Sequence, residues 1–147
     1  MISYIGKVFW DKNLIFKKNG YTHTKQLDHA SKRPVLIIAE SDEYIYYLRI
    51  SSHPGKSSTD IQLINEYGEH KNSFVSVNQI FRKPICFIKT TQIIGNSKML
   101  EILIMLKRYN RKIEKDEYYD EIKEQIDNLI NQYSIQFDGK TKNLKIK

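Results

Sequence analysis

The sequence predicts an α+β protein in which a curled antiparallel sheet, closed like a small β-barrel, is followed by C-terminal helices. Up to about Thr91 the chain consists of short runs rich in β-branched and aromatic residues. No helical pattern of about 10 to 15 residues separates these runs, so the strands should pair in antiparallel fashion. From Gly95 onward, apolar residues recur at helical spacing instead.

The predicted strands cover residues 2–10, 14–17, 34–39, 44–51, 60–64, 73–80 and 84–89. In segments 44–51 and 74–78, apolar side chains occupy every second position. This alternation is typical of strands that pack one face on a core.

Two helices are predicted after the strands. Asn96 or Ser97 can cap the first helix, and the second covers roughly residues 116–133. The first apolar stripe contains Met99, Ile102, Leu103 and Leu106, and the second contains Tyr118, Ile122, Ile126, Leu129 and Tyr133. Both stripes should pack on the sheet. The Lys-rich segment after Gly139 is expected to be frayed or a short edge segment.

Length and charge restrict the class of protein. The 147 residues suit a single domain spanning 1–147. With 24 Lys and Arg against 17 Asp and Glu, the formal net charge is +7, which favours nucleic acid or an anionic membrane surface as a partner. No apolar run approaches the roughly 18 residues of a membrane span, and no signal-peptide pattern opens the chain. A soluble cytoplasmic protein without a membrane partner is therefore expected.

Cysteine, histidine and glycine patterns exclude several chemistries. The only cysteine, Cys86, lies in an apolar run, so an intramolecular disulfide is impossible and a buried thiol is expected. The four histidines, His23, His29, His53 and His70, show no zinc-ligand spacing, and no glycines form a phosphate-binding loop. The sequence therefore predicts neither a metal nor a cofactor.

A cluster of cations, hydroxyls and one imidazole follows two of the predicted strands. Arg33 precedes Pro34, and a residue before proline adopts an extended conformation, so Arg33 should stand where a strand begins. Ser51 and Ser52 end the strand at 44–51. His53 comes next, and histidine is the residue type that titrates near neutral pH. Lys56 follows three residues later. The candidate catalytic residues are therefore Arg33, Ser51, Ser52, His53 and Lys56.

This cluster is suited to cutting RNA without a metal. The 2′-hydroxyl of RNA can attack the adjacent phosphorus if a base takes its proton, an acid protonates the leaving 5′-oxygen and cations stabilise the phosphoryl oxygens. Arg33 can bind two phosphate oxygens through its planar guanidinium, the serines can donate hydrogen bonds, and His53 can move protons. Lys25, Lys32, Arg82 and Lys83 are candidate RNA-binding cations around the cluster.

Structural roles for the same residues remain open. Arg33 can pair with a surface carboxylate, and Ser51 and Ser52 can cap a turn through local hydrogen bonds. His53-Pro54-Gly55-Lys56 is also an ordinary turn sequence, and Arg82 and Lys83 can be solvated.

Three segments resemble the MazF/PemK toxin superfamily: Arg33-Pro34-Val35-Leu36, the strand ending Ile50-Ser51-Ser52, and the run Ser73-Phe74-Val75-Ser76-Val77-Asn78-Gln79-Ile80. The resemblance covers about 60 residues. It implies an SH3-like β-barrel with appended helices and a metal-independent endoribonuclease. In that superfamily an arginine and a threonine or serine carry the activity, and they fall here on Arg33 and Ser51.

Within the superfamily, Ser51-Ser52-His53-Pro54-Gly55-Lys56 is most similar to the ToxN/CptN-like toxins of type III toxin–antitoxin systems. Their antitoxin is a structured, repeated RNA that the toxin processes and then binds, so an oligomeric protein–RNA assembly is implied. Ser51 and Ser52 would contact the scissile phosphate, and Lys32 or Arg33 together with Lys56 would stabilise it. The family lysine close after the serine has no exact counterpart here, and the insert at 17–32 departs from the MazF pattern.

Two other functions fit the same residues. One is a MazF-type messenger-RNA endonuclease restrained by a protein antitoxin. The other is a non-catalytic barrel that binds RNA or DNA through its cations and its 10 tyrosines. The type III toxin is expected to leave a 2′,3′-cyclic phosphate and a 5′-hydroxyl, whereas a binding module leaves RNA intact.

Overall fold

The computed structural model describes residues 3–26, 32–51, 60–63, 73–85, 88–90, 92–112 and 116–145. The strands are β1 Lys7–Asp11, β2 Asn13–Lys18, β3 Tyr21–Gln26, β4 Arg33–Glu40, β5 Tyr44–Ser51, β6 Asp60–Leu63, β7 Ser73–Pro84 and β8 Gln92–Ile93. Two helices, α1 Asn96–Lys112 and α2 Tyr119–Lys145, complete the chain. The predicted α+β class, with antiparallel strands before C-terminal helices, is confirmed.

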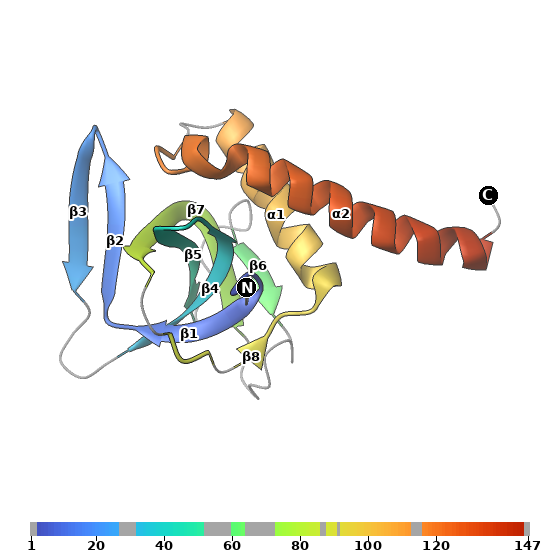
Figure 1. The fold of residues 1–147 in the computed structure, drawn as a ribbon, viewed down its shortest axis with the longest axis horizontal. Helices are drawn as coiled ribbons and strands as arrows, with labels where there is room; N and C mark the ends of the chain where they lie inside the picture. Colours follow the sequence, from blue (N-terminus) through green and yellow to red (C-terminus); the bar gives the residue numbers. More distant parts are fainter. Residues whose placement is uncertain are drawn as a thin grey trace.

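Six strands form one antiparallel sheet in the order β6-β7-β5-β4-β1-β8. The sheet curls strongly, with α1 and α2 on one side and the two-stranded ribbon β2–β3 projecting at the other (Figure 1). In the described part of the chain β6 and β8 are the edge strands, and closure of the sheet into a barrel remains a prediction.

The sheet is buried on both faces. The helix-side core includes Val8, Leu36, Leu48, Ile50, Val75 and Val77 from the strands and Met99, Ile102, Leu106, Ile122 and Ile126 from the helices. The hairpin-side core contains Phe9, Leu14, Val35, Ile37, Ile45, Tyr47, Phe81 and Ile88. Because successive strand residues point to opposite faces, the uninterrupted apolar run of β4 feeds both cores in turn.

Of the hairpin β2–β3, the sequence pattern predicts only the first strand, at 14–17. Asn19 and Gly20 connect its strands and have φ angles of 56° and 80°, as a two-residue turn of type I′ requires. The Asn-Gly pair indicates a hairpin and therefore a second strand after it. The sequence from Tyr21 to Gln26 is too polar to be recognised as a strand by its hydrophobic pattern. At the tip, the Gly20 N–H donates to Glu117 Oε1 at 2.8 Å, which ties the hairpin to the residues just before α2.

The predicted strand at 84–89 is wrong for the residues that the structure describes. Instead, β7 continues four residues beyond the predicted end at Ile80, and its last residue is Pro84. Proline has no N–H to donate to a further ladder. Ile85 then makes a single backbone bond to Glu43 at 2.8 Å, and residues 88–90 are not in a strand.

The first strand begins later than predicted. Gly6 has a φ of 86°, in the left-handed region that favours glycine, and the Lys7 N–H donates to the Tyr4 carbonyl at 3.1 Å. This turn separates the residues before it from β1, which starts at Lys7 rather than Ile2. The Gly6 backbone then bonds Ile37 and Ile94, at 2.8 and 2.7 Å.

The helices pack antiparallel to one another. Asn96 donates to Gln136 at 2.9 Å, and Lys107 pairs with Asp127 at 2.8 Å. α1 begins at Asn96, where the start was predicted, but Gly95 rather than Asn96 or Ser97 accepts its first backbone bond, from the Met99 N–H at 2.9 Å. Asp116 lies before α2 rather than in it, and its Oδ1 accepts the Tyr118 N–H at 2.9 Å as a cap.

The predicted end of the second helix at about residue 133 is wrong, and the segment after Gly139 is helical rather than an edge segment. Glycine often follows a helix end and costs about 1 kcal/mol relative to alanine inside one. α2 nevertheless includes Gly139 and continues to Lys145. Local propensity therefore gave the wrong boundary.

Candidate nucleic-acid interface

Arg33 and Ser51, on which the predicted chemistry depends, lie at the same end of neighbouring strands. The ladder between β4 and β5 pairs Val35 with Arg49. Continued by two residues, this antiparallel register brings Arg33 opposite Ser51. Directly opposed residues have Cβ atoms about 4.5–5.5 Å apart, so both side chains can reach one phosphate group.

These side chains lie on the face of the sheet that is turned away from the helices. Leu48 and Ile50 belong to the helix-side core, so the intervening Arg49 and the following Ser51 point to the opposite face. Arg33 is exposed, whereas Arg49 and Ser51 are half-buried. A cationic and hydroxylic corner therefore adjoins the hairpin-side core.

Strand β7 extends this corner. Phe74 pairs with Ser51, and Ser76 pairs with Arg49. Val75, between them, is in the helix-side core, so Phe74 and Ser76 share the face of Ser51 and Arg49. We call Arg33, Arg49, Ser51, Phe74 and Ser76 the polar strip. It combines two guanidinium groups, two hydroxyls and a half-buried aromatic ring.

Sequence reasoning did not single out Arg49, Phe74 or Ser76 as site residues. The signal for Arg49 was present, because the alternation through β5 puts it on the same face as Ser51. Phe74 and Ser76 could be found only once the β5–β7 register was known.

The carboxylate opposite Arg33 in the sheet, that of Asp11, has other partners. Asp11 is paired with Arg33 in the β1–β4 register. Its oxygens accept a hydrogen bond from the Tyr47 hydroxyl at 2.9 Å and contact Lys83 Nζ at 3.4 Å. Lys83, predicted to bind RNA, is therefore in an intramolecular ion pair. Within the described residues Arg33 has no ion pair.

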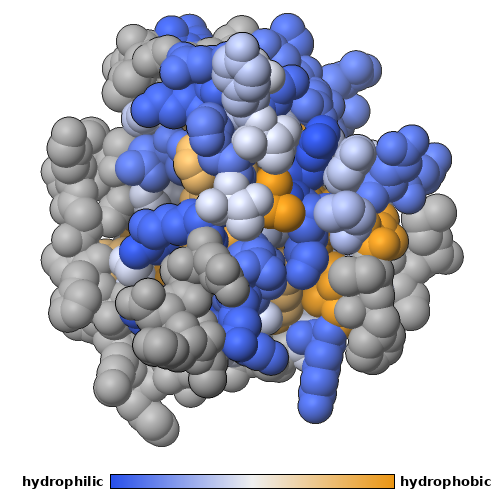
Figure 2. Space-filling model, turned by 90° about the vertical axis from the view of Figure 1, so that its left-hand side faces the viewer, coloured by the Kyte–Doolittle hydropathy of each residue, from blue (hydrophilic) through white to orange (hydrophobic). Residues whose placement is uncertain are grey.

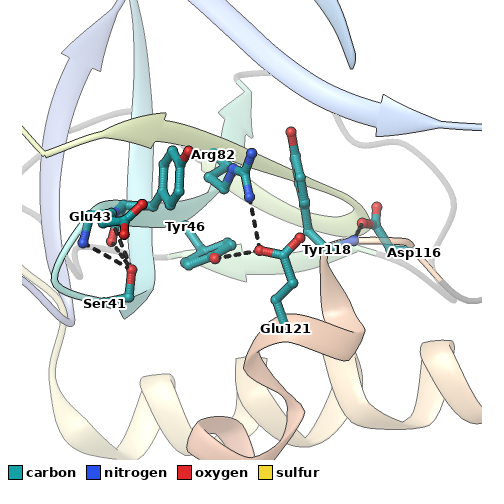
Figure 3. A network of polar contacts seen from close by, with 8 residues as sticks. Ser41, Glu43, Tyr46, Arg82, Asp116, Tyr118 and Glu121 are labelled. Atoms are coloured by element: carbon teal, nitrogen blue, oxygen red, sulfur yellow. Dashed lines mark hydrogen bonds and ion pairs between the residues drawn. The ribbon is translucent and has the colours of Figure 1, made fainter. Parts of the chain in front are cut away.

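Arg82, the other predicted RNA-binding residue of β7, lies between two aromatic rings. Its guanidinium carbon is 3.8 Å from the Tyr44 ring centre and 4.6 Å from that of Tyr118. Its Nη1 is 2.9 Å from Glu121 Oε1, which also accepts the Tyr46 hydroxyl at 2.6 Å (Figure 3). Arg82 therefore joins the sheet to α2.

The predicted RNA-binding residues Lys25 and Lys32 are both exposed. Lys32 directly precedes Arg33 and lies at the edge of the polar strip. Lys25 is on β3, opposite Leu14 of β2. Seen from the hairpin side, the described surface is mostly hydrophilic, with small hydrophobic areas (Figure 2).

Ser52, His53 and Lys56, the remaining predicted catalytic residues, lie outside the described residues, as do Cys86, His29 and His70. Of the predicted site, the structure describes Arg33 and Ser51 at the same end of neighbouring strands, with Lys32 directly before Arg33. It separates Arg82 from them by its contacts with α2.

Tyr46, which donates a hydrogen bond to Glu121, should make the stability of the fold depend on pH in the alkaline range. Burial, reinforced by Glu121, raises the pKa of Tyr46 to about 12. The ordinary tyrosine pKa is about 10, so between these values the folded protein keeps a proton that the unfolded chain loses. Stability should therefore be full below pH 10 and fall as the pH rises towards 12. Urea unfolding across this range should show the fall, and Tyr46→Phe should make it shallower; an equal slope in both proteins would contradict this.

Neither a membrane-spanning helix nor a metal-binding group is found in the described segments. No helix there is long and apolar enough to cross a bilayer. No three His, Cys, Asp or Glu side chains there are arranged to hold a metal ion.

No protein-family model matches the chain, and no curated protein matches it. Among solved structures, the Mycobacterium tuberculosis toxin MazF-mt6 is similar at 14% sequence identity and a TM-score of 0.46, over 66% of this chain and 93% of that one. A structure described as an Mtb toxin is similar at 17% identity and a TM-score of 0.44, over 54% of this chain and 94% of that one.

Proposed function

We propose that this protein is a toxin endoribonuclease of the MazF/PemK type that cuts RNA without a metal. One observation carries the proposal: β4 begins at Arg33 and β5 ends at Ser51, and the β4–β5 register, extended two residues beyond the pair Val35–Arg49, brings Arg33 opposite Ser51. These are the two residues that the sequence resemblance marks for catalysis. The net charge of +7 also favours a polyanionic substrate.

In the proposed reaction the RNA 2′-oxygen forms a bond to phosphorus while the bond from phosphorus to the 5′-oxygen breaks. A base removes the 2′-hydroxyl proton and an acid protonates the 5′-oxygen, which leaves a 2′,3′-cyclic phosphate and a 5′-hydroxyl. Arg33 stabilises the charge that develops on the phosphoryl oxygens, and Ser51 donates a hydrogen bond to them. His53 is the candidate for proton transfer.

We further propose a structured RNA antitoxin, in keeping with the resemblance of segment 51–56 to type III toxins. The toxin would process this RNA and remain bound to it in an oligomeric assembly. RNA that copurifies with one length and a fixed stoichiometry is expected. Heterogeneous RNA removed by salt would instead indicate simple electrostatic binding, and a copurifying acidic protein would indicate a protein antitoxin.

The direct test is incubation of the purified protein with a mixed-sequence RNA in excess EDTA, followed by analysis of the new ends. Discrete cuts with 2′,3′-cyclic phosphate and 5′-hydroxyl ends are expected. Ser51→Ala should cut more slowly, and urea unfolding checks that the variant is folded. Failure of a folded, RNA-free wild-type protein to cut any of several RNAs would refute the enzyme proposal.

A non-catalytic RNA-binding module is the second candidate. Phe74 favours it, because a half-buried ring beside two arginines can stack on a base whether or not cleavage follows. The same assay separates the two functions. A binding module would retain the RNA, protect it and release it intact.

A further inference from the structure

We propose that Arg49 binds a phosphate adjacent to the scissile one, so that the RNA backbone runs along β5. This inference rests on the proposed endoribonuclease function. It assigns Arg49, which the sequence resemblance does not mark, to substrate binding and aligns the RNA backbone with β5.

Spacing along β5 is the first argument. Arg49 and Ser51 are two residues apart in one strand and point to the same face. A strand rises about 3.3 Å per residue, so their Cα atoms are separated by about 6.6 Å. Neighbouring phosphates of a nucleic acid strand are a similar distance apart. A phosphate held at Arg33 and Ser51 therefore brings the next phosphate over Arg49.

The second argument is that Arg49 has no carboxylate partner among the described residues. The two half-buried cations of β7 each have a carboxylate: Arg82 contacts Glu121 at 2.9 Å and Lys83 contacts Asp11 at 3.4 Å. Arg49 is also half-buried, yet among the described residues its guanidinium has neither an ion pair nor a hydrogen bond. A partly desolvated cation without an anion is costly, so an anionic ligand at this position would relieve the cost.

The neighbours of Arg49 are the third argument. In the sheet it is flanked by Val35 of β4 and Ser76 of β7, neither of which carries a charge. Ser76 Oγ bonds Asn78 Oδ1 at 2.7 Å, so this hydroxyl proton has an acceptor other than a phosphate. Phe74 lies diagonally across from Arg49 on the same face, where its ring can stack on the base of the bound nucleotide.

The test uses the full chain and an oligoribonucleotide that contains one cleavage site mapped with the wild-type protein. Two modified oligoribonucleotides carry a neutral methylphosphonate in place of the phosphate immediately 5′ or 3′ to the scissile one. For the wild type, one of the two should lower kcat/KM about 10- to 100-fold, as expected for a lost charged hydrogen bond.

The variant Arg49→Ala should lower kcat/KM on the unmodified RNA by a similar factor. The kcat/KM of Arg49→Ala should fall little further when the same phosphate is replaced by a methylphosphonate. The substitution and the methylphosphonate remove the same interaction, so their effects should not add. Arg108→Ala, which removes an exposed arginine from α1, should leave both the rate and the methylphosphonate effect as in the wild type. Urea unfolding of each variant checks that it is folded.

The possible results separate this inference from the proposed function. No cleavage of unmodified RNA by the wild type would refute the endoribonuclease itself. Normal cleavage by Arg49→Ala, or a methylphosphonate effect that persists undiminished in that variant at both positions, would refute the role of Arg49 alone. If Arg49→Ala is unfolded, Arg49→Gln, which keeps the length and polarity of the chain without its charge, replaces it.

Discussion

Replacing Arg33 by alanine is expected to slow RNA cleavage by two to three orders of magnitude, about the loss seen when one transition-state donor is removed. The guanidinium can make two charged hydrogen bonds to phosphoryl oxygens, and alanine can make none. Single-turnover cleavage of a mapped RNA site measures the effect. The free energy of unfolding should change by less than about 0.5 kcal/mol, because Arg33 is exposed and has no ion pair in the described structure.

Two comparisons make this result specific. Arg33→Lys keeps the charge but loses the planar fork, so it should recover only part of the rate. Arg108→Ala should cleave like the wild type. Full activity of a folded Arg33→Ala would exclude the proposed chemistry at the polar strip, even if the protein cut RNA by another route.

The largest effect on stability is expected for Arg82→Ala. Each contact of the guanidinium with a tyrosine ring contributes about 0.5–1 kcal/mol, and the ion pair with Glu121 contributes about 1 kcal/mol. Their loss also leaves Glu121 with only the Tyr46 hydroxyl as a described partner. The free energy of unfolding should therefore fall by about 2–3 kcal/mol in urea.

The surface pair of Lys98 and Glu101 provides the matched control. Its N–O distance of 2.8 Å is nearly that of Arg82 and Glu121, but Glu101 is 54% exposed and the pair is local to α1. Lys98→Ala should cost less than about 0.5 kcal/mol. Equal effects of the two variants would mean that the sheet-to-helix network stabilises no more than a surface pair. Unchanged stability of Arg82→Ala with weaker RNA binding would restore the sequence-based role of Arg82.

Local sequence patterns predicted the parts of the fold that depend on local chemistry. β5 has the predicted bounds Tyr44–Ser51, because alternation and the end of the apolar run agree there. The start of α1 at Asn96 also agrees with the predicted position, although not with the predicted caps. The corner of Arg33 and Ser51 was also within reach, since the proline after Arg33 marks a strand start and Ser51 ends the next strand.

The ion pairs of Arg82 and Lys83 were not predicted, because their partners are distant in the sequence. Arg82 was read as a surface or RNA-binding cation, but its partner Glu121 lies 39 residues later in the chain. Lys83 and Asp11 are 72 residues apart. Local sequence patterns cannot identify pairs that are so far apart in the chain. They show which residues are charged but not which residues they contact. Arg49 differs from these pairs: the alternation along β5 places it on the face of Ser51, and only its uncharged neighbours Val35 and Ser76 depend on the strand order.

The hydrogen bond from Gly20 to Glu117 has a consequence for how the molecule is made. It joins the hairpin tip to residues that the ribosome adds 97 positions later. β1 likewise pairs with β8, and Gly6 accepts a backbone hydrogen bond from Ile94, so both contacts form only after the later residues have been synthesised. A nascent chain therefore emerges with its N-terminal strands lacking their final neighbours. The strands that carry the polar strip, β4, β5 and β7, are all synthesised before Glu117, so the hairpin gains this contact only after the strip has been made.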